Sequence, residues 1–328
     1  MKVLILRFSS IGDIVLTTPV LRALKDQLSD VEIHFLTKES FRPILENNPD
    51  IDRLWTMKRS LWEISEALKN ENFDAIIDLH NNVRTLKLKL ILRRKSHSFV
   101  KLNLKKWILT NFKLNLLPEI HIVDRYFKTV ENLGVKNKNY SCQYTLTDRD
   151  KVDIEANYQL KEQQYFGFAI GAQYATKRLP VNKIIELLKG IESPILLLGG
   201  KEDRTVGDEI VKNLSSNHIV NTCGNHTLSE SAFLVSKSKG LITHDTGLMH
   251  IATCFNIPII SIWGNTVPSL GMYPYYPNAN ISFTINEVKD LSCRPCSKIG
   301  FSKCPKGHFN CMNKQDLNQI RNEINKLR

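Results

Sequence analysis

The stretch KVLILRFSSIGDIVL, residues 2–16, predicts a buried strand, a tight turn and the start of a helix. Its apolar run ends at residue 7, the loop SSIGD follows, and an amphipathic pattern continues from Ile14 to Leu28. Further strand patterns lie at 31–37, 52–57, 74–80, 165–171, 194–200, 218–224, 240–247 and 258–265. Helical patterns separate most of these runs. The alternation predicts an α/β fold with doubly wound, Rossmann-like parallel sheets.

A polar passage at about 136–164 interrupts the alternation, which then restarts. A chain of 328 residues also exceeds what a single core usually fills. We therefore expect two Rossmann-like domains, at residues 1–150 and 151–312, and a C-terminal helix within 313–328.

The composition indicates a globular protein that acts on anionic partners. Hydrophobic residues make up 42% and charged residues 24% of the chain, and the net charge is +12. No apolar stretch is long enough to cross a bilayer. Arg7 and Asp13 interrupt the N-terminal apolar run as no secretory signal would allow, so a cytoplasmic location is expected.

Ligands of doubly wound sheets bind where the strands end, so each strand-to-loop junction is a candidate site. Asp13 stands at the first junction, where it could cap the following helix or act as a general base; for the residue alone, capping is the better interpretation. At residues 171–180, Lys177 and Arg178 suit a phosphate group as well as they suit a basic surface loop. Glu202, in the loop GGKED at 199–203, could bind ribose hydroxyls or cap a helix.

The most specific junction is THDTGLMH, residues 243–250. Thr246 and Gly247 precede a predicted helix whose first N–H groups would bind an anion, and His250 could donate to a phosphate oxygen. A lone His in such a place is more often structural, but the combination favours anion binding. Neither a G-x-G-x-x-G nor a P-loop motif occurs, which weighs against a dinucleotide or P-loop protein.

Together these residues resemble glycosyltransferase family 9, whose best-known members are the ADP-heptose:lipopolysaccharide heptosyltransferases. The matching motifs are R-x-x-x-I-G-D, TTP, K-x-x-P, G-G-x-E-D, D-[ST]-G-x-x-H and a Pro/Gly/Thr/Pro series, at residues 7–13, 17–19, 177–180, 199–203, 245–250 and 258–268. The resemblance implies a GT-B fold with the active site in the cleft between the two domains. It also implies an inverting enzyme that moves heptose from ADP-heptose to the lipopolysaccharide inner core and needs no catalytic cofactor.

The resemblance also assigns roles to single residues. Asp13 matches the catalytic base, Lys177 the cation that neutralises the diphosphate, and Glu202 the ribose contact. The diphosphate loop corresponds to Asp245, Thr246, Gly247 and His250. Gln173 stands where related enzymes often carry a hydroxyl that binds the donor. Two D-x-D sequences, at 50–52 and 148–150, lie in loop-like surroundings and are read as incidental.

Residues 84–118 contain ten Lys or Arg and no Asp or Glu. Such a run is usually a solvated face. In the acceptor half of such an enzyme it also suits an anionic glycolipid and the inner face of the membrane. Arg84, Arg93 and Arg94 are the candidate acceptor-binding cations.

Cys293, Cys296, Cys304 and Cys311 have a spacing compatible with a structural zinc site, with His308 as a substitute ligand. Four reduced thiols are an equally good interpretation.

The alternative functions are transfer of another sugar to a surface glycan, NAD-dependent oxidoreduction and nucleic-acid binding. The last is suggested by charge alone, and no nucleic-acid partner is expected.

Overall fold

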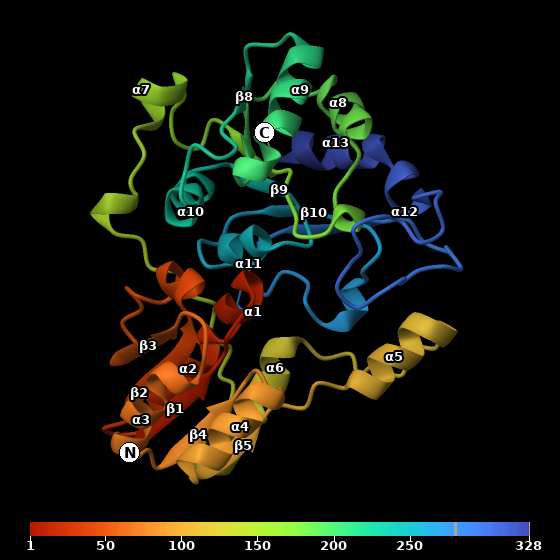
Figure 1. The fold of residues 1–328 in the computed structure, drawn as a ribbon. Helices are drawn as coiled ribbons and strands as arrows, with labels where there is room; N and C mark the ends of the chain where they lie inside the picture. The colour runs from red at the N-terminus through yellow and green to blue at the C-terminus, as the bar shows by residue number, and fades with distance from the viewer. Residues whose placement is uncertain (279–280, 328) are drawn as a thin grey trace. The chain divides into compact units, whose positions relative to one another are not determined.

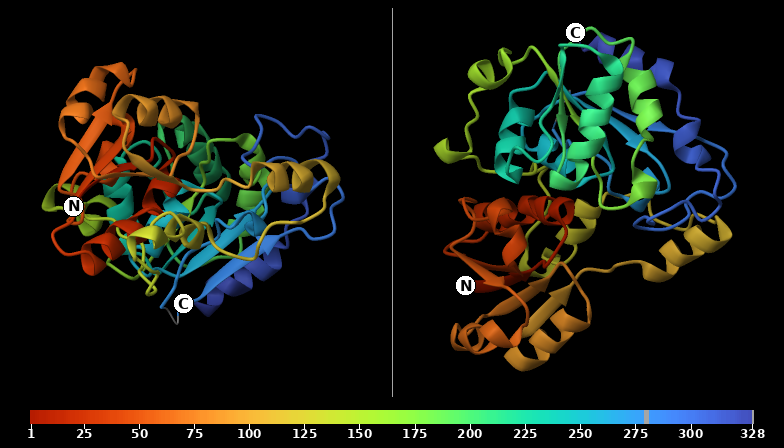
Figure 2. Two further views of the ribbon diagram at one scale, coloured as in Figure 1. Left: turned by 90° about the horizontal axis from the view of Figure 1, so that it is seen from below. Right: turned by 45° about the horizontal axis from the view of Figure 1, so that its top comes forward.

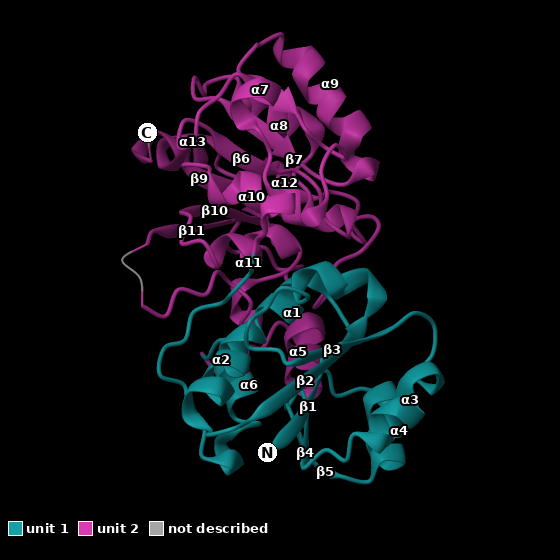
Figure 3. Ribbon diagram, turned by 90° about the vertical axis from the view of Figure 1, so that its left-hand side faces the viewer, with its two compact units in different colours: residues 1–101, 120–145 teal, residues 102–119, 146–328 magenta. Residues whose placement is uncertain are grey.

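The computed structural model describes residues 1–278 and 281–327, and the chain divides into two compact units. Unit 1 comprises Met1–Lys101 and Ile120–Thr145, and unit 2 comprises Leu102–Glu119 and Leu146–Arg328 (Figure 3). Unit 2 therefore takes in a short segment, residues 102–119, that interrupts unit 1 in the sequence.

Unit 1 is built on a sheet of five parallel strands in the order β3-β2-β1-β4-β5 (Figure 1). The strands are β1 (Lys2–Leu6), β2 (Glu32–Lys38), β3 (Arg53–Met57), β4 (Ala75–Asp78) and β5 (Lys95–Ser98). Its helices are α1 (Ile11–Val15), α2 (Thr18–Gln27), α3 (Trp62–Asn70), α4 (Val83–Leu92) and α6 (Ile122–Phe127), with 3-10 turns η1 (Glu39–Ile44) and η2 (Glu131–Leu133).

The helix expected from Ile14 to Leu28 is in fact two helices, α1 and α2. Pro19 lacks an N–H group and restricts the residue before it, so a continuous helix is broken at this point. The Thr17 and Thr18 hydroxyls donate to the carbonyls of Ile14 and Val15, at 2.6 and 2.7 Å, and satisfy the end of α1.

Unit 2 is built on six parallel strands in the order β11-β10-β9-β6-β7-β8. The strands are β6 (Phe166–Ala169), β7 (Ile195–Leu198), β8 (Ile219–Asn221), β9 (Gly240–His244), β10 (Ile259–Trp263) and β11 (Phe283–Glu287). The helices are α5 (Asn103–Phe112), α7 (Ile154–Tyr158), α8 (Val181–Leu188), α9 (Arg204–Leu214), α10 (Leu228–Ser236), α11 (Gly247–Thr253), α12 (Asn310–Asn313) and α13 (Leu317–Lys326). The 3-10 turns are η3 (Asp148–Asp150), η4 (Ala175–Lys177), η5 (Lys201–Asp203) and η6 (Pro268–Leu270).

Both faces of this second sheet are covered by helices (Figure 1 and Figure 2). Phe166 and Phe168 of β6 pack on one side with α8, α9 and α13, and Tyr165 and Ala169 pack on the other with α10 and α11. Successive side chains of a strand point to opposite faces, so this alternation accounts for the continuous apolar runs in the sequence.

The prediction of two doubly wound α/β domains is confirmed. Strands β5 and β11 were not predicted: KSHS contains no apolar side chain, and FTINE is a short and mainly polar run with a single buried residue. Every helix in the described residues is too short or too polar to span a bilayer.

Candidate active site

Each sheet has one place where the direction of its strand order reverses, and such a switch point opens a crevice at the carboxyl ends of the strands. In unit 1 the reversal lies between β1 and β4, and in unit 2 between β6 and β9. Asp13 follows β1, Lys177 follows β6 and Asp245 follows β9. The predicted catalytic and diphosphate-binding residues therefore stand at the switch points of the two units.

Asp13 lies in the first turn of α1 and does two things at once. Its Oδ2 accepts hydrogen bonds from the Ser10 backbone N–H at 3.2 Å and from the Ser10 hydroxyl at 2.7 Å, so it caps the helix as the simpler interpretation requires. Its Oδ1 lies 2.6 Å from Nη2 of Arg7. The Asp13 side chain keeps 19% of its surface exposed, so a solvent-side approach to the carboxylate is open.

Two residues near Asp13 were not assigned to the site from the sequence, although one of them, Arg7, opens the R-x-x-x-I-G-D motif. Arg7 is buried, and its guanidinium also donates to the carbonyls of Ser9 at 2.8 Å and Leu79 at 2.5 Å, which holds it beneath the first junction. His80 follows β4; burial, together with the charges of Arg7 and Lys101, lowers its pKa to about 3. Two features of the sequence could have indicated them: Arg7 is a cation at the end of a buried apolar strand, and His80 follows the end of another strand.

The second switch point carries an ion pair. Lys177 Nζ lies 2.6 Å from Oδ2 of Asp245 and 3.3 Å from its backbone carbonyl oxygen. The same Oδ2 accepts a hydrogen bond from the Thr266 hydroxyl at 2.9 Å. The Asp245 carboxylate thus links the loops after β6, β9 and β10, and it fixes the position of the Lys177 ammonium group.

The loop after β6 is held further by His244 and Asp203. Burial, followed by the charge of Arg178, lowers the pKa of His244 to about 4, and Nε2 of this neutral ring accepts the Leu179 N–H at 2.9 Å. Asp203 is buried and accepts the Gly200 N–H at 2.9 Å. A Cβ on Gly171 would lie 2.1 Å from Oδ2 of Asp203, so a larger residue there would displace this carboxylate.

The remaining predicted donor residues are distributed around this loop. Gln173 and Glu202 are exposed, at the ends of β6 and β7. Thr246 is the N-cap of α11, its hydroxyl is 3.2 Å from that of Thr243, and Gly247 opens the helix. His250 is only 2% exposed and lies in the interior of unit 2.

The profile of glycosyltransferase family 9 (heptosyltransferase) matches residues 61–300, which is more than two thirds of the sequence. The chain belongs to glycosyltransferase family 9. The resemblance identified from the motifs is thereby confirmed.

Individual members of glycosyltransferase family 9 are similar to this chain over most of their length. Lipopolysaccharide heptosyltransferase 1 of Campylobacter coli is 29% identical over 314 residues, covering 88% of this chain and 89% of its own. Lipooligosaccharide heptosyltransferase 2 of Haemophilus ducreyi is 25% identical over 296 residues, covering 82% and 85%. The solved structure of the Escherichia coli ADP-heptose lps heptosyltransferase II has a TM-score of 0.72 at 19% identity and covers 100% and 98%. The predicted GT-B fold class is confirmed.

The predicted acceptor-binding cations lie at opposite ends of the strands of the first sheet. Arg84 lies in the first turn of α4, after β4, with its guanidinium over the Phe8 ring, 5.6 Å from the centroid, at the same ends of the strands as Asp13. Arg93 and Arg94 follow α4 and lie beside Asn72, at the edge where the strands begin. Because β4 alone spans about 13 Å, Arg93 and Arg94 do not share a small-molecule site with Asp13.

The Cys-containing segment 291–311, here called the Cys loop, contacts the loops that follow β6 and β10 in unit 2. Arg294 is nearly buried and donates to the carbonyls of Gly264 at 2.5 Å and Thr266 at 2.8 Å. The Phe301 carbonyl oxygen accepts the Thr176 N–H at 3.2 Å. The Cys loop therefore braces two of the loops that position Lys177.

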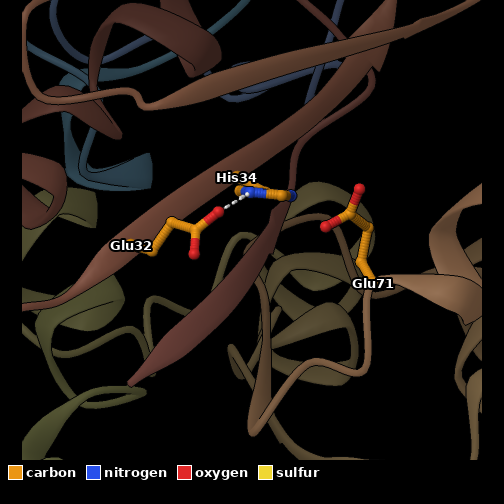
Figure 4. Close-up of side chains that lie close together, drawn as sticks. All are labelled: Glu32, His34 and Glu71. Atoms are coloured by element: carbon orange, nitrogen blue, oxygen red, sulfur yellow. Dashed lines mark hydrogen bonds and ion pairs between the residues drawn. The ribbon is translucent and has the colours of Figure 1, made fainter.

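A different group of potential metal ligands, formed by Glu32, His34 and Glu71, lies where the first sheet begins (Figure 4). His34 Nδ1 accepts the Trp55 indole N–H at 3.0 Å, so Nε2 carries the proton and donates to Glu32 at 2.7 Å. Lys2 pairs with both carboxylates, at 3.3 Å to Glu32 and 2.9 Å to Glu71. This arrangement is a satisfied ion-pair network and has no lone pair on the ring to offer a metal ion.

Proposed function

We propose that this family 9 protein transfers heptose from ADP-heptose to the lipopolysaccharide inner core. Its relatives named above are heptosyltransferases of lipopolysaccharide and lipooligosaccharide, and one is named for ADP-heptose. The observation that carries the proposal is the Lys177–Asp245–Thr266 network at the switch point of unit 2. An ammonium group with three donors can keep its bond to Asp245 and offer another proton to a diphosphate oxygen.

The proposed reaction is a single displacement with inversion at the anomeric carbon. An Asp13 carboxylate oxygen takes the proton of the acceptor hydroxyl while that oxygen attacks the anomeric carbon. The bond from this carbon to the diphosphate oxygen breaks, and ADP leaves with the electron pair. Lys177 and the N–H groups at Thr246 and Gly247 stabilise the negative charge that grows on the diphosphate. Glu202 contacts the ribose and Gln173 completes the donor contacts, while the buried His250 acts only by supporting the loop at Thr246 and Gly247 from within unit 2.

Chemistry of this kind needs no divalent cation, because Lys177 carries the compensating charge. The D-x-D sequences are used elsewhere: Asp52 pairs with Lys25 at 2.6 Å, and Asp150 accepts the Thr147 N–H at 2.7 Å. Transfer measured in EDTA should equal transfer in Mg²⁺. Activity that disappears in chelator and returns with Mg²⁺ would contradict the proposal.

Transfer of a different sugar to a surface glycan is the competing function. A donor screen separates the two, using ADP-heptose, ADP-glucose and UDP-glucose with a purified heptose-deficient inner core as acceptor. We expect product with ADP-heptose at a rate at least a hundredfold above the other donors. Preference for a hexose donor would favour the competing function.

We further propose that Cys293, Cys296, Cys304 and Cys311 hold a structural zinc ion. The four thiols are close enough to affect one another: after the larger effect of burial, Cys293 and Cys304 raise the pKa of Cys296, and Cys296, Cys304 and Cys293 raise that of Cys311. His308 Nδ1 accepts the Asn310 N–H at 3.0 Å, so Nε2, which lies 3.8 Å from Cys293 Sγ, is a donor to that sulfur and not a ligand. Because sulfur atoms around zinc lie about 3.8 Å apart, the Cys loop must tighten to bind the ion.

Elemental analysis of protein purified under reducing conditions tests the zinc proposal. We expect about one zinc per chain, lost in Cys293→Ser together with a lower unfolding temperature. Protein that is free of metal and equally stable in added zinc would contradict it.

The proposed acceptor is an anionic membrane glycolipid, and we place the enzyme in the cytoplasm, in peripheral contact with the anionic inner membrane. The ten cations within residues 84–118 support this location, because an anionic leaflet attracts such clusters.

A further inference from the structure

Large apolar side chains are exposed mainly in one stretch of the chain. Of the thirteen large hydrophobic residues that are exposed in the described residues, nine lie between 83 and 116. They are Val83, Leu86, Leu90, Val100, Leu104, Trp107, Phe112, Leu114 and Leu116. Exposed apolar side chains concentrated in this way mark an interaction surface, whereas scattered ones do not.

Helix α5 carries three of these side chains, and they lie on one side of the helix. Leu104, Trp107 and Phe112 are 70%, 53% and 68% exposed, and their spacing places them on one side of an α-helix. The Trp107 and Phe112 rings lie edge to face with centroids 5.4 Å apart. Leu109, about 160° around the helix from Trp107, is buried. Leu109 is thus the buried contact of the helix, and Leu104, Trp107 and Phe112 face solvent.

Helix α5 contacts the Cys loop. Lys113, the C-cap of α5, donates from Nζ to the Pro295 carbonyl oxygen at 2.8 Å. A hollow of about 350 Å³ beside this contact is lined by residues of both segments. These residues are Thr110, Asn111, Lys113, Ser292, Cys293, Cys296, Pro305 and Lys306. The contact with the Cys loop therefore fixes the helix in unit 2 and leaves its apolar face exposed to solvent.

The charge around this face selects its partner. Lys105 and Lys106 lie in α5 itself, and residues 84–118 have no acidic side chain to balance the ten cations. Two copies of such a surface would repel each other, whereas an anionic bilayer both attracts the cations and accepts the apolar side chains. Exposed Trp, Phe and Leu side chains flanked by Lys are typical of a helix that lies in a membrane interface.

We propose that α5 and the segment that follows it, residues 103–116, insert the Leu104/Trp107/Phe112 face into the surface of an anionic bilayer. The inference rests on the proposed function only in that the acceptor is a membrane glycolipid. Helix α4 of unit 1 carries a second exposed stripe, Val83, Leu86 and Leu90, with Lys87 on the same side. It supplies a separate contact of the same chemistry.

The test uses the full-length protein and sugar-free vesicles of phosphatidylcholine with 30% phosphatidylglycerol. Trp107→Ser/Phe112→Ser should reduce co-sedimentation at least tenfold, because the apolar side chains carry the part of binding that salt does not screen. Trp62→Ser is the matched control: Trp62 is 75% exposed on α3, next to Glu63 and outside the basic run, and its loss should change binding less than twofold. Raising salt to 0.5 M should weaken wild-type binding without abolishing it.

The outcomes separate this inference from its alternatives. Equal binding of the double variant and wild type, or complete release of wild type by salt, would mean that charge alone holds the protein on the surface and would overturn insertion. A wild-type dimer in sedimentation equilibrium that the double variant lacks would make the face a contact between copies. Leu86→Ser/Leu90→Ser should lower binding independently of the α5 variant.

The proposed function is tested separately with a delipidated, water-soluble acceptor. Turnover on that acceptor should be unchanged in Trp107→Ser/Phe112→Ser, while transfer to the same acceptor in vesicles falls about tenfold. If wild type transfers no heptose to either acceptor but still binds vesicles through α5, the proposed function fails and the inference stands.

Discussion

At the scale of the residue, Asp13 is both a helix cap and the proposed base. Asp13→Asn should lower turnover by about a hundredfold or more, the usual cost of losing a general base, while ADP affinity stays unchanged. Asp150 is a matched control, because it accepts the N–H and hydroxyl of Thr147 as Asp13 accepts those of Ser10. Asp150→Asn should lose only the cap, so its turnover should remain within twofold of wild type. If the two variants behave alike in a steady-state assay, Asp13 is a cap only.

Lys177 is the residue whose removal should affect binding and chemistry together. Lys177→Ala should weaken ADP binding about tenfold and slow turnover further, because the charge it compensates grows in the transition state. Lys183→Ala is the control, since Lys183 pairs with Glu186 on the surface of α8 at 2.7 Å. Calorimetric titration with ADP measures the first effect. An unchanged dissociation constant and rate would make Lys177 a structural partner of Asp245.

At the scale of the element, the neutral His244 ring links the end of β9 to the loop after β6. Its pKa is about 4 in the folded protein because of burial and then Arg178, and the ordinary value is about 6.5. The unfolded chain therefore takes up a proton first as the pH falls, so stability is present above pH 6.5 and is lost down to pH 4. Urea unfolding of His244→Gln should show a shallower loss across this window than wild type. The same slope in both proteins would mean that other groups dominate acid unfolding.

The edge elements show why element prediction failed in places. Strand β5 and helix α5 both fall in the basic run, and β5, with the sequence KSHS, has no apolar side chain to mark a buried face. In α5 the apolar face points outward, so periodicity alone would have assigned it to the core. Only the burial of Leu109 and the contact of Lys113 with the Cys loop reveal the true orientation.

At the scale of the whole molecule, the two units should respond differently to nucleotide. All the proposed ADP contacts lie in unit 2, so ADP at a hundred times its dissociation constant should stabilise that unit by about 2.7 kcal/mol. Hydrogen exchange should show protection in the loops at 171–178, 199–203 and 245–250, with no more than a small change at 9–13. Protection centred on 9–13 and 79–82 would instead place the nucleotide in unit 1 and overturn the assignment.

The sequence by itself determined the α/β class, the two repeats of strand-helix alternation and the motif residues at the strand ends. These follow from local patterning, since a buried parallel strand must be apolar and its loop must begin where that run stops. Arg7 and His80 beside Asp13, the bond from Thr266 to Asp245, the separation of Arg93 and Arg94 from Asp13 and the outward face of α5 were decided only by the tertiary structure. Each depends on which strands are neighbours in the sheet or on which side of a helix is covered, and pairing between distant segments leaves no mark on local sequence.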